Sequence, residues 1–333
     1  MAELLFLTIN SSDSCAFYRS AGVIKDLRRK TDHNINLAQW DQARIDWSFI
    51  SQMDAIMIQR PFSKEALNLC GYIKLLGIKL WIDYDDNLFA LNPENDVSEM
   101  YDDTNIKENI KGILRMADVV TVPTENLKQD YSEFNKNITV IPNAFNDTIF
   151  FRPKELAPRT NNCAWRGPRT HIWDLLSHIN EINQLTEKFS DWRFVFMGFR
   201  IDKSVLYYYL HNTNNKAHIP SMDPVIYFKA LMDMSPSCLH VPLADNPFNR
   251  AKSNIAAIEG NYAGAVCVVP AWWNMPGTIP YTDGKSYYEG IKSVLSGEVD
   301  KVAMNKEAWD YIMDCLRLSK VNEQRIDIIK SLL

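Results

Sequence analysis

Short apolar runs alternate with longer segments of helical periodicity through the first half of the chain. Each run has the length and the β-branched or apolar content of a buried strand, and the five runs are 4–9, 55–59, 79–83, 119–123 and 138–141. Between them, segments such as 66–76 and 106–116 repeat apolar residues at three- and four-residue intervals, which predicts helices with one buried face. Strands that alternate with helices predict a parallel sheet covered by helices.

The second half repeats this pattern, with apolar runs at 163–165, 193–197, 238–243 and 265–269. Helical periodicity fills the intervals, at 172–186, 225–234 and 255–263. We therefore predict two doubly wound α/β domains with a boundary in 146–162, where prolines and polar residues interrupt the periodicity. Because open parallel sheets bind ligands at the carboxyl ends of their strands, we expect the site to consist of polar residues that follow the strands.

The composition suits a large folded protein. Its 333 residues, 46% of them hydrophobic, suffice for two cores and exclude disordered and fibrous classes. No apolar run approaches the roughly 18 to 20 residues that cross a bilayer, and no basic segment precedes the first strand, so we expect a cytoplasmic protein. The six cysteines lack paired spacing and are interpreted as reduced core residues. A net charge of −5 argues against nucleic-acid binding over the whole surface but allows a local basic patch.

The most informative segment is the polar loop that follows the apolar run 238–243. Lys252 lies in this loop, Ser253 is a suitable N-cap, and a helix is predicted from Ile255. Free amides at a helix start, the helix dipole and a lysine amine together favour a phosphate group. Glu259, further along the helix, is able to accept hydrogen bonds from sugar or ribose hydroxyls. The alternative is a solvated loop and an amphipathic helix without a ligand.

This loop and helix, with the Gly264-Ala265-Val266 that closes them, resemble the donor site of retaining GT-B glycosyltransferases of the broad GT4-like group. They are most similar to the short bacterial and phage members that have a Lys-Ser pair here. In the common form of the group, one glutamate contacts the transferred sugar and a second, seven intervening residues later, contacts the ribose. Glu259 matches the second glutamate, but Ala251 occupies the first position. The resemblance therefore leaves the sugar open.

Further segments extend the resemblance over most of the chain. They are 15–19 and 83–89, which resemble cleft loops, 117–125 and 140–146, which resemble the end of the first domain, and 165–175, which resembles the start of the second. The fold implied is GT-B, with two Rossmann-like domains facing a central cleft. Residues 1–150 would bind the acceptor and 151–333 the nucleotide sugar, and the last helix would return to the first domain.

The resemblance assigns candidate roles residue by residue. The candidates for catalysis are Lys252, Arg169, Asp85, Asp86 and His171, with Arg166 as an alternative to Arg169. Those for donor binding are Asn249, Arg250, Ser253, Asn254, Glu259 and Gly167, and those for acceptor binding are Arg19 and Tyr18. Fixed cations and helix amides would stabilise the leaving diphosphate electrostatically.

Asp85 and Asp86 admit three interpretations. Either is able to orient an acceptor hydroxyl, Asp86 or Asn87 is able to cap a following turn, and the carboxylates are able to chelate a divalent cation. The metal-binding DxD motif belongs to a different glycosyltransferase architecture, so we expect no essential metal and no tightly bound cofactor. The first strand is followed by no GxGxxG sequence, which argues against a nicotinamide dehydrogenase.

The resemblance implies an enzyme that transfers a hexose or pentose from a UDP-sugar to a hydroxyl with retention of configuration. One acceptor hypothesis is 5-hydroxymethylcytosine in phage double-stranded DNA, in the host cytoplasm, for which Arg19, Arg28, Arg29, Lys30, Arg44 and Arg60 would supply a basic face. The alternatives left open are a cell-surface glycan or lipid-linked sugar acceptor, a sugar-nucleotide epimerase, and a catalytically idle nucleotide-binding protein. The oligomeric state is left open as well.

Overall fold

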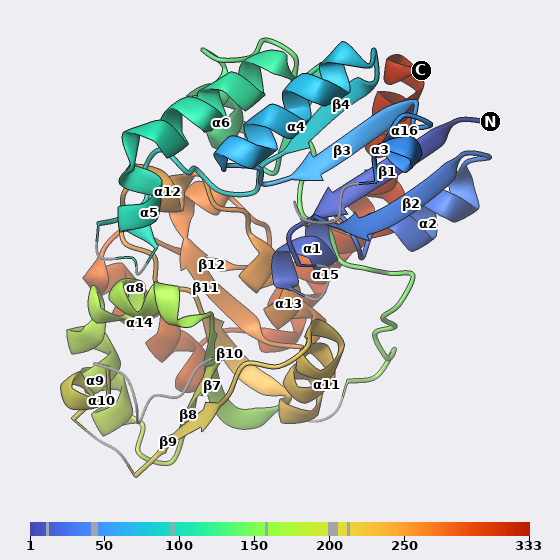
Figure 1. The fold of residues 1–333 in the computed structure, drawn as a ribbon. Coiled ribbons are helices and arrows are strands. Elements are labelled where there is room, and N and C mark those ends of the chain that lie inside the picture. The colour runs from blue at the N-terminus through green and yellow to red at the C-terminus, as the bar shows by residue number, and fades with distance from the viewer. Residues whose placement is uncertain are drawn as a thin grey trace. The chain divides into compact units, whose positions relative to one another are not determined.

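The computed structural model describes residues 1–10, 13–40, 46–93, 95, 97–156, 159–198, 206–211 and 214–333 (Figure 1). Arg44, a member of the predicted basic face, lies outside the described residues. The chain divides into two compact units. Unit 1 comprises Met1–Ile149, Asn246–Ser253 and Leu316–Leu333, and unit 2 comprises Phe150–Asp245 and Asn254–Cys315. The predicted donor loop therefore folds with unit 1, although the chain on both sides of it belongs to unit 2.

Unit 1 is built on a parallel sheet whose six described strands have the order β2-β1-β3-β4-β5-β6. The strands are β1 Glu3–Thr8, β2 Asn34–Gln39, β3 Ala55–Gln59, β4 Lys79–Asp83, β5 Val119–Val122 and β6 Ile138–Val140. The helices are α1 Ser14–Arg19, α2 Ile24–Lys30, α3 Trp47–Ile50, α4 Lys64–Leu75, α5 Ser98–Asp102, α6 Thr104–Met116, α7 Glu125–Tyr131, α12 Pro247–Arg250 and α16 Leu318–Leu332.

Helices cover both faces of this sheet because side chains alternate along each strand. Ile56 and Ile58 of β3 join a core with residues of α4 and α6. Met57, between them, joins a second core with residues of α2 and α16. Figure 1 shows the C-terminal helix α16 beside α2. The last helix thus completes the fold of unit 1.

Unit 2 repeats the architecture with the order β12-β11-β10-β7-β8-β9, all parallel among the strands that the structure describes. The strands are β7 Thr160–Arg166, β8 Arg193–Met197, β9 Lys216–Ile219, β10 Pro236–His240, β11 Val266–Pro270 and β12 Ile279–Tyr281. The helices are η2 Arg169–His171, α8 Ile172–Leu176, α9 Ile179–Lys188, α10 Leu206–Tyr209, α11 Pro224–Met234, α13 Ile255–Tyr262, η4 Ala271–Trp273, α14 Gly284–Leu295 and α15 Lys301–Cys315. The predicted helix 172–186 is in fact two helices, α8 and α9, with Ser177 and His178 between them.

The two strand orders confirm the predicted fold class of two doubly wound sheets. In such sheets the strand order reverses at one point, and ligands bind there, outside the carboxyl ends of the strands. The reversal lies between β1 and β3 in unit 1 and between β7 and β10 in unit 2. Arg60 follows β3 and Arg166 ends β7, so each unit places an arginine at its own switch point.

Candidate active site

Four charged side chains of unit 1 form a compact group that we call the Asp86 cluster: Arg60, Asp85, Asp86 and Lys252. Lys252 Nζ lies 3.0 Å from Asp86 Oδ1 and 4.1 Å from the centre of the Phe248 ring. Arg60 donates from Nε to Asp85 Oδ1 at 2.7 Å and from Nη2 to Asp86 Oδ2 at 3.0 Å. Two cations therefore balance two carboxylates, and the predicted catalytic residues Lys252, Asp85 and Asp86 come together.

Arg60 reaches this cluster through an unusual backbone. Its φ of +49° lies in the left-handed region, which costs a non-glycine residue about 1–3 kcal/mol. Its N–H donates to Asp83 O at 2.8 Å, which holds the turn at the end of β3. Burial acts to lower the pKa of Arg60, but the charges of Asp85 and Asp86 outweigh it and raise the pKa well above its ordinary value. The sequence indicated Arg60 only as part of a basic surface, and its role in the cluster was missed.

Arg19 is a buried structural residue, and the prediction that it contacts the acceptor is wrong. Its side chain is fully buried, with Nε and Nη2 donating to Asp83 at 3.0 and 2.7 Å. Nη1 donates to Ile141 O at 2.6 Å and to Asn143 Oδ1 at 3.2 Å. Asn143 Nδ2 in turn donates to Ser253 Oγ at 2.8 Å. Arg19 thus supports the segment that carries Lys252 rather than a ligand. Tyr18 is also buried, with its ring edge-on to Phe17, and offers no open surface to an acceptor.

The donor loop is anchored to unit 1 by its backbone. Ala251 O accepts from Thr124 Oγ1 at 2.8 Å, and Arg250 O accepts from Asn126 Nδ2 at 2.7 Å. The Ala251 side chain is fully buried in the apolar core beside α4 and α6. A carboxylate at this position would have to be buried in that core, which is costly unless it is paired.

The predicted N-cap is wrong by one residue. Helix α13 has Asn254 as its N-cap, with no side-chain hydrogen bond to the first turn, whereas the Ser253 hydroxyl accepts from Asn143. Asn249 is buried, its N–H bonded to Asn246 Oδ1, and Arg250 is exposed. Donor contacts by these loop residues remain predictions.

In unit 2, three side chains surround one buried carboxylate, and we call them the Glu259 cluster: Arg166, Tyr227 and Glu259. Glu259 is 3% exposed and lies on α13. Arg166 Nε lies 2.5 Å from Glu259 Oε2, and Tyr227 donates its hydroxyl to the same oxygen at 2.8 Å. Burial, together with the Glu259 charge, raises the pKa of Tyr227 well above its ordinary value. Arg166, the alternative to Arg169 in the sequence, is therefore the arginine that contacts a predicted donor residue, and Arg169 lies exposed in η2.

His171 and Gly167 have local structural partners in unit 2. His171 Nδ1 lies 2.8 Å from Asp174 Oδ2, and Asp174 Oδ1 accepts from the Ala244 N–H at 3.1 Å. The imidazole is thereby oriented from the loop that follows β10. A Cβ on Gly167 would lie 2.8 Å from the Trp165 ring, so this position needs glycine for packing. Ligand contacts by His171 and Gly167 remain predictions.

Within the described ranges, no group of three or more histidine, cysteine, aspartate or glutamate residues is arranged to hold a metal ion. Asp85 and Asp86, the pair considered for a cation, are occupied by Arg60 and Lys252. None of the described helices combines the length and the apolar character that a membrane span requires.

No protein-family model matches the chain, and no curated protein matches its sequence. Solved structures match it over nearly its whole length. An alpha-glucosyltransferase in complex with UDP and a 13-mer DNA containing a central A:G mismatch gives a TM-score of 0.65 at 14% identity, covering 99% of this chain and 100% of that chain. Alr3699/HepE from Anabaena, in complex with UDP and glucose, gives 0.71 at 12% identity over 99% and 100%.

The chain has the GT-B fold. A putative UDP-N-acetylglucosamine 2-epimerase from Listeria monocytogenes also matches, with a TM-score of 0.60 at 11% identity over 99% of this chain and 96% of that chain. Because the same GT-B fold serves transferases and epimerases, the choice between these activities depends on the residues of the site.

Proposed function

We propose that this chain is a glycosyltransferase that moves a sugar from a UDP-sugar to a hydroxyl acceptor. The observation that carries the proposal is the position of Lys252. Its amine lies 3.0 Å from Asp86. Along the chain, Lys252 comes three residues before Ile255, the first residue of α13, and the first turn of that helix receives no side-chain cap. A lysine that comes just before a helix start in the chain suits a diphosphate, and this order of residues occurs on a GT-B fold.

The chemistry that these residues support is electrostatic. As the bond between the anomeric carbon and the diphosphate oxygen breaks, negative charge develops on the leaving group. Lys252 stabilises that charge, and Glu259 holds the ribose of the donor. When Lys252 turns from Asp86 to the diphosphate, the Asp86 carboxylate becomes able to orient the acceptor hydroxyl and accept its hydrogen bond.

This partner exchange also supports retention of configuration. Lys252 and Asp86 are in direct contact, so the leaving diphosphate and the entering hydroxyl are drawn to the same small region. The acceptor oxygen bonds to the anomeric carbon on the face that the diphosphate oxygen vacates, and the hydroxyl proton passes to the departing diphosphate. This retains the configuration and needs no covalent nucleophile from the protein.

For the acceptor, we favour a hydroxymethylated base in DNA. Support comes from the GT-B alpha-glucosyltransferase that was solved with UDP and DNA. Arg28, Arg29 and Lys30 of α2 are exposed and form the described basic run of unit 1. Arg19 does not contribute to a DNA-binding face because it is buried.

The test is mass spectrometry of products after incubation of the protein with a panel of nucleotide sugars. Duplex DNA that contains 5-hydroxymethylcytosine is the acceptor, and the same duplex with cytosine is the control. A gain of one sugar on the modified base supports the proposal. Consumption of the donor without any gain on DNA redirects the acceptor search to glycans, an isomerised sugar nucleotide indicates an epimerase, and an unchanged donor contradicts an enzymatic role.

A further inference from the structure

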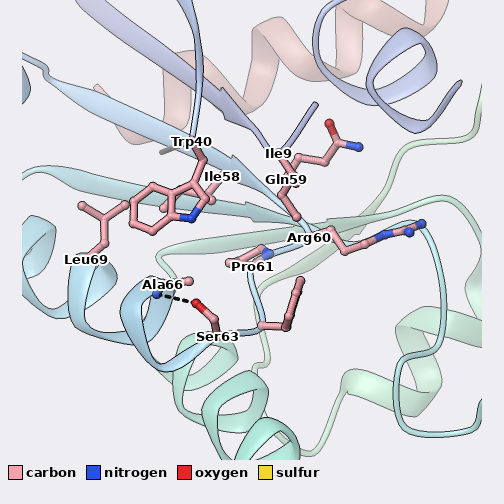
Figure 2. A pocket seen from close by; sticks show the side chains of 10 residues that line it. Ile9, Trp40, Ile58, Gln59, Arg60, Pro61, Ser63, Ala66 and Leu69 are labelled. Carbon is pink, nitrogen blue, oxygen red and sulfur yellow. Dashed lines mark hydrogen bonds between the residues drawn. The ribbon is translucent and has the colours of Figure 1, made fainter. Parts of the chain in front are cut away.

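Three cations of unit 2 lie around the start of α15 without a carboxylate partner, and we call them the Arg159 cluster: Arg152, Arg159 and Lys301. Within the part of the chain that the structure describes, none of the three forms an ion pair, although each is half-buried. Arg60 of unit 1, drawn at the end of β3 in Figure 2, shows the contrasting arrangement, because two carboxylates hold it. The described residues therefore leave the charge of the Arg159 cluster unbalanced.

The backbone and a neutral amide fix the two arginines. Arg159 Nε donates to Gly264 O at 2.7 Å, and its Nη2 donates to Lys301 O at 3.3 Å. Arg152 donates from Nη2 to Asn305 Oδ1, one turn further along α15. Neutral oxygens hold the guanidinium groups in place but bring no negative charge to them.

Aromatic rings hold the remaining parts of the cluster. Lys301 Nζ lies 5.1 Å from the centre of the Trp192 ring, and the Arg152 guanidinium carbon lies 4.5 Å from the centre of the Trp309 ring. Arg152 Nε is buried and has no acceptor among the described residues. An aromatic face attracts a cation but does not neutralise it, so the rings keep these charges partly away from water.

The three cations destabilise one another. Burial, and after it the charge of Arg159, lowers the pKa of Arg152 to about 10. Burial also lowers the pKa of Lys301, and the charge of Arg159 adds to that effect. Half-buried charges without a counter-ion are costly, and an arriving anion would remove part of this cost.

Two carboxylates act on the cluster from beyond ion-pair distance, and both have other partners. The charge of Asp300 acts on Arg159 and that of Asp310 acts on Arg152. Asp300 Oδ1 accepts from two backbone N–H groups in the first turn of α15, both at 3.0 Å. Asp310 forms an exposed pair with Lys306. Neither carboxylate takes the place of a ligand at the cluster.

We propose that the Arg159 cluster is a binding site for a phosphate dianion, either inorganic phosphate or a phosphate monoester. Guanidinium groups and a lysine amine are good donors to phosphate oxygens. A dianion balances two of the three cations, whereas the singly charged diester of a nucleic-acid backbone balances only one.

This site is separate from the Glu259 cluster. Arg159 precedes β7 and Arg166 ends it, so the two arginines stand at opposite ends of one strand. At about 3.3 Å per residue, the strand sets them about 23 Å apart. Phosphate binding at the Arg159 cluster therefore does not depend on the proposed glycosyltransferase reaction.

The first test is thermal unfolding of the full chain during a titration with inorganic phosphate, with sodium chloride at equal ionic strength as the reference. All proteins carry Lys252→Ala, so that a phosphate at the donor loop does not contribute. Lys301→Met removes one charge of the cluster but no hydrogen bond of the described chain. The matched control is Lys188→Met, which changes a lysine of unit 2 that also lies over an aromatic ring, 5.8 Å from the centre of Phe189.

We expect phosphate to stabilise the Lys252→Ala protein and the control. Its apparent Kd should be about tenfold weaker for Lys301→Met, as for the loss of one charge-assisted hydrogen bond. Lys301→Arg keeps the charge and should bind phosphate as the Lys252→Ala protein does. An equal response to phosphate by all variants, or an equal response to sodium chloride, overturns the proposal.

The second test locates the ligand by hydrogen exchange and mass spectrometry of the Lys252→Ala protein. Phosphate should slow exchange in 301–309 of α15 and leave 324–332 of α16 unchanged. Protection confined to other segments overturns the proposal. Duplex DNA with unphosphorylated ends is the second ligand, and protection of 301–309 by this DNA but not by inorganic phosphate would assign the site to a diester and overturn the dianion.

Discussion

The Asp86 cluster of unit 1 and the Glu259 cluster of unit 2 are both built from a carboxylate and a cation near a switch point, but they differ in exposure. The contrast lies in the carboxylates: Asp86 is 23% exposed and Glu259 is 4% exposed, while their cations Lys252 and Arg166 are 15% and 19% exposed. A partly exposed pair has little net energy to lose, so it is able to exchange partners with an arriving ligand. A buried carboxylate such as Glu259 is costly to leave without its partners, and it therefore holds its geometry. We infer that the first cluster responds to the substrate and the second keeps its shape.

Lys252→Ala should have the largest effect, and it tests whether the Asp86 cluster takes part in the reaction. If Lys252 stabilises the leaving diphosphate, kcat should fall on the order of a hundredfold, as when one preorganised charge stabiliser is removed. Thermal unfolding should change little because the pair with Asp86 is partly exposed. Steady-state kinetics with the UDP-sugar provide the measurement, and Lys306→Ala, which removes an exposed lysine paired with Asp310, is the control. Turnover near that of the control would exclude Lys252 from the reaction.

Glu259→Gln should lower the stability of the protein, whereas Lys252→Ala should leave it nearly unchanged. The amide keeps the shape of the side chain but leaves Arg166 without its charge partner, and hydrogen bonds to charged groups contribute about 1.5–3 kcal/mol. We expect the free energy of unfolding to fall by about 2 kcal/mol, measured by urea denaturation. Glu289→Gln removes the carboxylate of an exposed pair with Lys292 and should leave stability unchanged. Equal stability of the two variants would remove the distinction between the clusters.

Acid should destabilise unit 2 more than unit 1. His240 Nδ1 lies 2.6 Å from the Tyr287 hydroxyl, and the His178 ring stacks on Tyr287 with 4.4 Å between ring centres. Burial lowers the pKa of His240 to about 3 and also lowers the pKa of His178. The unfolded chain takes up these protons near pH 6.5, so stability is full above that pH and falls as the pH drops toward 3. The slope that His240 contributes reaches about 1.4 kcal/mol per pH unit, and His178 contributes in the same direction.

Hydrogen exchange followed by mass spectrometry at pH 7 and pH 5 separates the two units. Five of the six histidines, all but His33, belong to unit 2. Faster exchange at pH 5, after correction for the intrinsic rate, should appear in β10 and α14 before it appears in β3 and β4. A uniform response of both sheets would contradict the assignment of acid sensitivity to the buried imidazoles.

The two regions also differ in how far the sequence predicted them. Strands β3, β4 and β8 have the predicted bounds because each is an uninterrupted apolar run. Strands β2, β9 and β12 were missed because they are short or mixed in polarity and lie at or near the edges of their sheets. Local sequence pointed to Lys252 and Glu259, since the loop and the helix start are adjacent in the chain.

Long-range contacts explain the errors in the site. Arg19 follows the first strand like a ligand-binding arginine, but its partner Asp83 is 64 residues away and buries it. The role of Arg60 depends on a left-handed backbone and on Asp85, 25 residues along the chain. Such contacts leave no local periodicity, so pattern analysis had no means of finding them.

The smallest expected effect concerns the link between the core of unit 1 and its donor loop. Asn143 accepts from Arg19 Nη1 at 3.2 Å and donates to Ser253 Oγ at 2.8 Å, one residue from Lys252. Asn143→Ala removes that bridge, and one neutral hydrogen bond contributes about 1 kcal/mol, so kcat should fall by about three- to tenfold. Ser253→Ala removes only the far end of the bridge. If Asn143 acts through Ser253, the double variant Asn143→Ala/Ser253→Ala should have a kcat no lower than that of the slower single variant. Both changes break the same link. Additive losses in kcat would instead mean that Asn143 and Ser253 serve the reaction independently, and the partner exchange at Lys252 would then not depend on the buried arginine beneath it.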